Sequence, residues 1–77
     1  MDKLNPQENF WLSELGITLY RARIKKRENL TDCGVRIGLS RQTYRKMEQG
    51  SPTVDIGHYI KALNYYGILG GEFYRQP

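Results

Sequence analysis

Residues 29–50 read NLTDCGVRIGLSRQTYRKMEQG, two short amphipathic segments on either side of Gly38. Asn29 and Ser40 begin the two segments, and both residue types favour the N-cap of a helix. Neither segment contains proline, and apolar residues recur in both at the spacing of one helix face. These apolar positions are Leu30, Cys33, Ile37, Tyr44 and Met47. The stretch predicts two short helices, over residues 30–37 and 41–49, joined by a glycine turn.

The glycines of this stretch fit the geometry of a helix-turn-helix unit. Such a unit needs a turn glycine, here Gly38, and a small residue four positions earlier, where the two helices cross almost in contact. Gly34 occupies that earlier position, and Leu39 adds an apolar residue after the turn glycine. We therefore predict a helix-turn-helix over about residues 30–49. Helix pairs with a glycine turn also occur in proteins that bind no nucleic acid.

The preceding sequence predicts one longer helix. Asn5, Pro6 and Glu8 have the order of a capped helix start, in which the asparagine and the glutamate bond to each other's backbone. The helix is expected to begin at Pro6 or Phe10 and to end at Lys26, and in the second case the residues before Ser13 form a separate arm. Its apolar stripe is Leu12, Leu15, Leu19 and Ala22.

The following sequence predicts a fourth helix, capped by Thr53 or Asp55 and ended by Gly67. Its expected apolar stripe is Ile56, Tyr59 with Ile60, Leu63 and Tyr66. The chain then divides into an N-terminal arm or helix start (residues 1–8), one helical domain (residues 9–69) and a short C-terminal tail (residues 70–77).

Positive charge is concentrated around the predicted helix pair. Residues 21–46 carry nine Lys or Arg residues and two acidic ones, a net charge of +7, whereas the rest of the chain carries −3. Such a distribution indicates that one region of the protein faces a polyanion.

Residues 38–50, GLSRQTYRKMEQG, resemble the Xre/Cro/C1 family of bacterial and phage repressors. The resemblance extends over about residues 15–68, and residues 50–59, GSPTVDIGHY, are similar to the subgroup that includes HipB-like antitoxins. The family implies an all-α, lambda-repressor-like domain of four or five helices. It also implies a homodimer that binds palindromic operators in double-stranded DNA and regulates transcription, most often as a repressor.

The resemblance implies roles for individual residues on the second helix of the pair. Arg41 and Gln42 begin that helix and are expected to read base edges, since arginine suits guanine and glutamine suits adenine. Lys46 and Arg45, one turn further along, are expected to read bases as well, although Arg45 could instead grip phosphate.

Further residues are expected to contact phosphates, namely Ser40, Thr43, Lys25, Lys26 and Arg27. The last three also stand where positive charge favours the C-terminus of a helix, and the two roles are compatible. The family often pairs an arginine of the first helix with the glutamate before the glycine that ends the recognition helix. Arg23 and Glu48 are therefore expected to form a structural ion pair.

The remaining sequence argues against catalysis and metal binding. The chain of 77 residues has one histidine and one cysteine, so no nucleophile, base and orienting group can be assembled and no metal cluster is expected. We predict no enzyme activity and no cofactor. His58 is expected to face solvent and Cys33 to lie in the core, and Tyr59, Tyr65 and Tyr66 are expected to be core residues rather than a base-stacking surface.

Two further expectations concern location and partners. The sequence has no apolar run of about 18 residues and does not begin with the pattern of a secretory signal, so we expect a cytoplasmic protein. Phe10 and Trp11 either cover the domain's own core or form a dimer contact. An alternative function is that of an antitoxin, which would neutralise a HipA-like kinase and regulate its own operon.

Overall fold

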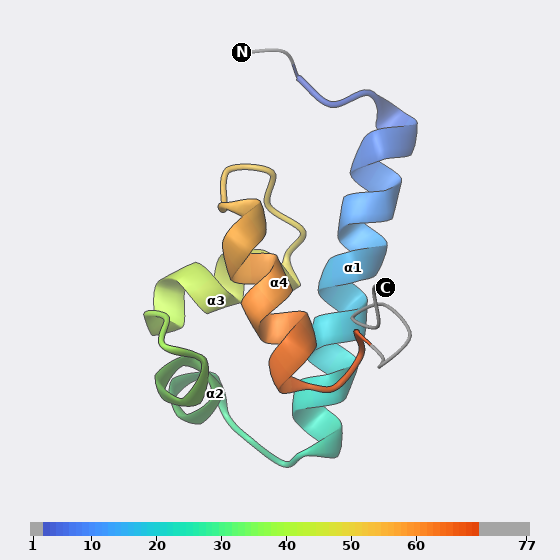
Figure 1. Cartoon of the computed structure of the whole chain (residues 1–77). Coiled ribbons are helices and arrows are strands. Elements are labelled where there is room, and N and C mark those ends of the chain that lie inside the picture. The colour runs from blue at the N-terminus through green and yellow to red at the C-terminus, as the bar shows by residue number, and fades with distance from the viewer. Residues whose placement is uncertain (1–2, 70–77) are drawn as a thin grey trace, which may run out of the picture.

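The computed structural model describes residues 3–69, which form four α-helices and no strand. The helices are α1 (Pro6–Lys25), α2 (Leu30–Ile37), α3 (Arg41–Glu48) and α4 (Ile56–Tyr65), as Figure 1 shows. The all-α prediction is confirmed, and the predicted ends of the first three helices lie within one residue of the observed ones, with α1 beginning at the earlier of its two predicted starts. Within the same residues, no helix combines the length and the apolar character needed to cross a membrane.

α1 is a single continuous helix. The side chain of Asn5 accepts a hydrogen bond from the Glu8 amide at 2.8 Å, and the Glu8 carboxylate accepts one from the Asn5 amide at 2.9 Å. This reciprocal cap satisfies two amides that the first turn of a helix leaves without a partner. The residues before Ser13 are therefore part of the helix, and the alternative of a separate arm is wrong for residues 6–12.

The caps of α2 and α3 are those expected. Asn29 accepts from the Asp32 amide at 2.7 Å, and Ser40 accepts from the Thr43 amide at 3.1 Å. Asp55 stands at the N-cap of α4 but makes no side-chain cap hydrogen bond. Thr53 is not a cap either, because its backbone amide and hydroxyl bond the hydroxyl of Ser51 in the preceding loop.

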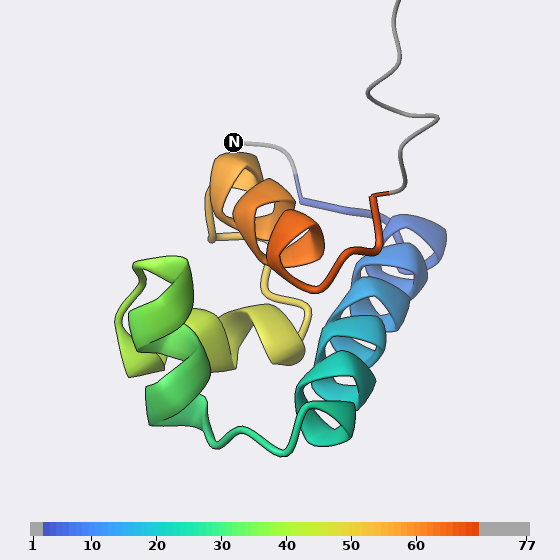
Figure 2. The ribbon, with the colours of Figure 1, turned by 60° about the horizontal axis from the view of Figure 1, so that its bottom comes forward.

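The core lies between α1 on one side and the α2–α3 pair on the other, with α4 across the remaining opening (Figure 2). Its buried hydrophobic residues are Leu19, Cys33, Ile37, Tyr44, Met47, Tyr59 and Ala62. Cys33 is thus a core residue, as expected, and Tyr65 and Tyr66 pack against this cluster half-buried.

The predicted inner face of α4 is partly wrong. Tyr59 is buried as predicted, but Ile56 and Ile60 are exposed, and Ala62, which was not predicted, is buried instead. The Tyr59 hydroxyl donates a 2.6 Å hydrogen bond to the Ser51 carbonyl in the loop before the helix. Burying this large ring with its polar end satisfied fixes the rotation of α4, and the two isoleucines then face away from the core.

α1 and α3 approach each other with almost no side chain between them. A Cβ atom added to Gly16 of α1 would lie 2.5 Å from the Glu48 carbonyl oxygen, and one added to Gly50 would lie 2.8 Å from the Leu12 carbonyl oxygen. Gly16 is buried at this crossing, a role that no pattern in the sequence indicated.

Candidate nucleic-acid interface

α2 and α3 are joined by a three-residue connection that holds them in contact. Gly38 adopts a left-handed conformation with φ of +89°, and the amides of Gly38 and Leu39 both donate to the Gly34 carbonyl at 2.8 Å. A Cβ atom on Gly34 would lie 2.8 Å from the Leu39 carbonyl oxygen. Gly38 thus forms the predicted turn, in a left-handed conformation that glycine adopts readily, and Gly34 permits the predicted close crossing of the two helices.

α3 separates its apolar and its polar side chains onto opposite faces. Tyr44 and Met47 are fully buried against the rest of the domain. The outward face carries the four side chains expected to read bases, all of them exposed: Arg41, Gln42, Arg45 and Lys46. The structure therefore brings these four residues together on one accessible surface, which we call the α3 outer face.

The two hydroxyl residues at the start of α3 bond to each other. The Ser40 hydroxyl donates to the Thr43 hydroxyl at 2.9 Å while it caps the Thr43 amide. The hydrogen of Ser40 is thereby used within the cap. The Thr43 hydroxyl accepts that bond and keeps its own hydrogen for an external acceptor.

The three cations at the end of α1 are all exposed, but their surroundings differ. The Lys26 ammonium lies 4.9 Å from the centre of the Tyr65 ring, a cation–π contact that directs it toward the end of α4. Arg27 has a positive φ of 59° in the turn that follows α1. Lys25 is in the last turn of α1, where its charge also complements the helix dipole.

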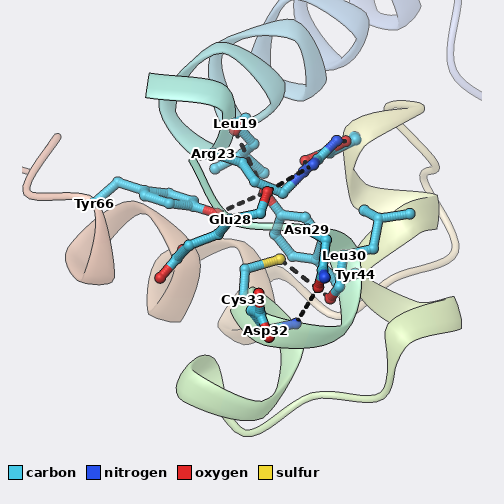
Figure 3. A network of polar contacts seen from close by, with 10 residues as sticks. Leu19, Arg23, Glu28, Asn29, Leu30, Asp32, Cys33, Tyr44 and Tyr66 are labelled. Atoms are coloured by element: carbon cyan, nitrogen blue, oxygen red, sulfur yellow. Dashed lines mark hydrogen bonds and ion pairs between the residues drawn. The ribbon is translucent and has the colours of Figure 1, made fainter. Parts of the chain in front are cut away.

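Arg23 links three parts of the fold (Figure 3). Its Nε and Nη2 atoms donate to the two carboxylate oxygens of Glu48 at 2.7 and 3.1 Å, and its Nη1 atom donates to the Glu28 carbonyl at 2.9 Å. The side chains of Arg23 and Glu48 are only 12% and 9% exposed. The hydrogen bond with Glu48 raises the pKa of Arg23. The expected structural ion pair is therefore present.

A second polar cluster was not foreseen from the sequence. The Glu28 carboxylate accepts a 2.5 Å hydrogen bond from the Tyr65 hydroxyl. It also forms an ion pair with Arg36, whose Nε atom lies 3.2 Å from a carboxylate oxygen. The Tyr44 and Tyr66 hydroxyls lie 3.0 Å apart, and the Tyr44 hydroxyl also donates to the Leu19 carbonyl at 3.4 Å. The partners of the tyrosine hydroxyls are 22 to 37 residues away in the sequence, so no local pattern could have identified these hydrogen bonds.

His58 lines an open groove rather than facing bulk solvent. The groove has a volume of about 710 Å³ and lies between the start of α1, the loop after α3 and the start of α4. His58 is half-buried there, so the expectation that it faces solvent is inexact. Apolar side chains make up much of the lining, namely Leu4, Leu12, Pro52, Val54 and Ile56. The part of the chain that the structure describes contains no group of three or more His, Cys, Asp or Glu residues that could hold a metal ion.

No family model matches the chain, and the searches of curated proteins and of solved structures found no match either.

Proposed function

We propose that this protein is a sequence-specific DNA-binding regulator that acts in the cytoplasm, with α2 and α3 as the helix-turn-helix of a lambda-repressor-like domain. The observation that supports it most is the α3 outer face. Four basic or amide side chains project from a helix whose opposite side is anchored by buried Tyr44 and Met47. A helix held in this way presents its polar side chains as a rigid unit to the major groove.

The chemistry of the α3 outer face suits base edges. Arg41 and Gln42 are in the first helical turn, directly after the Ser40 cap. The arginine fork matches the O6 and N7 atoms of guanine, and the glutamine amide matches the N6 and N7 atoms of adenine. Arg45 and Lys46 extend the readout by one turn.

Other groups near α3 suit phosphate oxygens. The Thr43 hydroxyl keeps a hydrogen to donate, and the Leu30 and Thr31 amides in the first turn of α2 have no carbonyl partner within their helix. Lys25 and Arg27 add exposed positive charge next to the start of α2. These contacts position the domain on the duplex, whereas the α3 outer face selects the sequence.

The regulator acts as a homodimer on an inverted repeat. Two α3 helices related by a two-fold axis enter successive major grooves, so the half-sites are about 34 Å apart, one turn of the duplex. Bound at a promoter, such a dimer excludes the transcription machinery and represses the gene.

The test is selection of bound duplexes from a random pool, carried out at two salt concentrations. Contacts to phosphate weaken steeply with salt, while base contacts determine the sequence that is recovered. We expect an inverted repeat whose binding persists at moderate salt. Recovery of no consensus, with binding lost as salt rises, would contradict the proposal.

The antitoxin alternative is favoured by the groove beside residues 50–59. Its apolar lining and open form offer a surface to another protein, next to Thr43 and Lys46 of α3. Affinity purification from the native host tests it, with Val54→Asp in the groove as the variant and exposed Val35→Asp on α2 as the control. Recovery of a kinase-like protein by the wild type and by the control, and its loss with V54D, would support the antitoxin function.

A further inference from the structure

α1 carries a second apolar stripe, which is not buried in the core of the domain. Phe10, Ile17 and Ile24 follow one another at intervals of seven residues, and Tyr20 falls between the last two. Their side chains are 55%, 39%, 48% and 48% exposed in the order Phe10, Ile17, Tyr20 and Ile24. At about 100° of rotation per residue they lie on the side of α1 away from Leu19, which is fully buried.

The spacing of this stripe is that of a helix that packs against another helix. Apolar residues at intervals of seven, with a further one three residues on, form the seam of a two-helix coiled coil. A surface helix needs one apolar face to pack on its own core, and Leu12, Leu15 and Leu19 supply that face. Phe10 also stacks edge-to-face with exposed Trp11, so the alternative that this aromatic pair covers the domain's own core is wrong.

The middle of the stripe is held in place by the fold. The Arg23 guanidinium lies 5.5 Å from the centre of the Tyr20 ring, and Arg23 is itself fixed by Glu48. Ile17 and Tyr20 line an open hollow of about 280 Å³ together with Arg45 of α3. A contact surface that is already ordered loses less conformational entropy when a partner binds.

The charges along the stripe select the partner and its direction. Glu14 and Arg21 are exposed, seven residues apart, and both lie on the edge of the stripe that faces away from α3. If a second α1 packs antiparallel across a two-fold axis near Ile17, Glu14 of each copy faces Arg21 of the other. In a parallel pair, each of these charges would have to meet the opposite edge of the stripe, where Gly16 is buried and Arg23 is already paired.

We propose that the outer stripe of α1 is the homodimer interface, and that a second copy of this chain packs on it antiparallel. Two symmetric Glu14–Arg21 pairs flank a seam of Phe10, Ile17, Tyr20 and Ile24. The symmetry is closed, so association stops at the dimer. The inference specifies the homodimer that the proposed function requires, but it is tested without DNA, so that the two can fail separately.

A charge exchange tests both the surface and the direction. Sedimentation equilibrium without DNA should show a dimer for the wild type, and Glu14→Arg or Arg21→Glu alone should weaken it by about tenfold or more, because each places two like-charged pairs in the interface. An equimolar mixture of the two variants should form a heterodimer, since all four charges are then matched. The double variant E14R/R21E should dimerise like the wild type.

A second pair of variants tests the apolar seam. Ile17→Asp should abolish dimerisation, whereas Val35→Asp, at a side chain on α2 that is 74% exposed, should leave it unchanged. Circular dichroism on each variant confirms that the helices are retained. A wild-type chain that stays monomeric, a dimer insensitive to both charge variants, or a mixture that associates no better than its components would overturn the proposal. If the charge exchange behaves as expected but duplex selection yields no consensus, the interface stands and the DNA-binding function fails.

Discussion

The Arg23 guanidinium donates one hydrogen bond to each oxygen of the Glu48 carboxylate and so joins α1 to the last residue of α3. The third bond of Arg23, to the Glu28 carbonyl, reaches the connection between α1 and α2. One side chain thereby connects α1, the end of α3 and the segment between α1 and α2. Because Arg23 also lies over the Tyr20 ring, the same residue adjoins the proposed dimer stripe.

Removing the carboxylate should cost much of the stability of this small domain. Glu48→Ala leaves the Arg23 guanidinium nearly buried without its counter-charge, and we expect the free energy of unfolding to fall by about 3 kcal/mol. Urea denaturation measures the loss, with Lys61→Ala, at an exposed side chain on α4, as the control that should change stability by less than about 0.5 kcal/mol. A loss below about 1 kcal/mol at Glu48 would show that the pair is solvated as ordinary surface pairs are.

Two glycine-to-alanine changes should have opposite signs. Gly34→Ala places a methyl group against the Leu39 carbonyl oxygen and forces α2 and α3 apart, so we expect destabilisation of at least about 1 kcal/mol. Gly57→Ala, in the first turn of α4, meets no atom within 4 Å and should stabilise by up to about 1 kcal/mol through the unfolded state. Thermal denaturation gives the Tm of both variants, and equal changes in Tm would show that α2 and α3 are not in close contact.

Stability should decline in alkaline solution. Burial raises the pKa of Tyr44, and burial raises that of Tyr66, in each case above the usual value of 10.0. The folded protein therefore keeps these protons at a pH where the unfolded chain has lost them, so the stabilisation is complete below about pH 10 and decreases above it. Each group contributes a slope that approaches about 1.4 kcal/mol per pH unit.

Tyr66→Phe isolates one of these two contributions. Denaturation series from about pH 8 to pH 11 should show a shallower alkaline decline for the variant than for the wild type. An identical slope in both proteins would mean that the Tyr66 hydroxyl ionises as readily in the folded state as in the unfolded chain.

Substitutions on the α3 outer face and at the end of α1 should separate specificity from affinity. On the selected operator, Arg41→Ala should lose about 1 to 3 kcal/mol of discrimination at one base position. Lys25→Ala should weaken all duplexes alike and reduce the salt dependence by about one phosphate contact. Binding measured against operator and scrambled duplexes distinguishes the two, and Lys61→Ala, an exposed cation on α4, serves as the control. Equal losses on both duplexes for Arg41→Ala would remove it from the base-reading set.

The parts of the fold that were predictable are those with local causes. Asn29 and Ser40 act on amides three residues away, and Gly38 adopts the left-handed turn that its own lack of a side chain permits. Arg23 and Glu48 are 25 residues apart, and their pairing was expected only from the resemblance.

The features that sequence reasoning missed depend on tertiary packing. In α4, apolar residues occur on more than one side, so periodicity found Tyr59 but could not choose Ala62 over Ile56 and Ile60 as buried residues. The Glu28 contact with Tyr65 spans 37 residues and arises only when α4 packs against the start of α2. The outer stripe of α1 was overlooked although its spacing is local. The inner stripe already gave the helix one apolar face to bury, so no second apolar face was sought.

Gly16 of α1 contacts the backbone at the end of α3. The distance between the outer stripe of α1 and the α3 outer face is therefore set by the main chain. Backbone meets backbone at this point, so substitutions in the core can change how tightly the domain folds without changing how far α3 stands from α1. If two copies join through α1, the span between their α3 helices is then a fixed length. Such a dimer binds DNA whose half-sites have the same spacing as its two α3 helices, and other DNA must bend to reach that spacing.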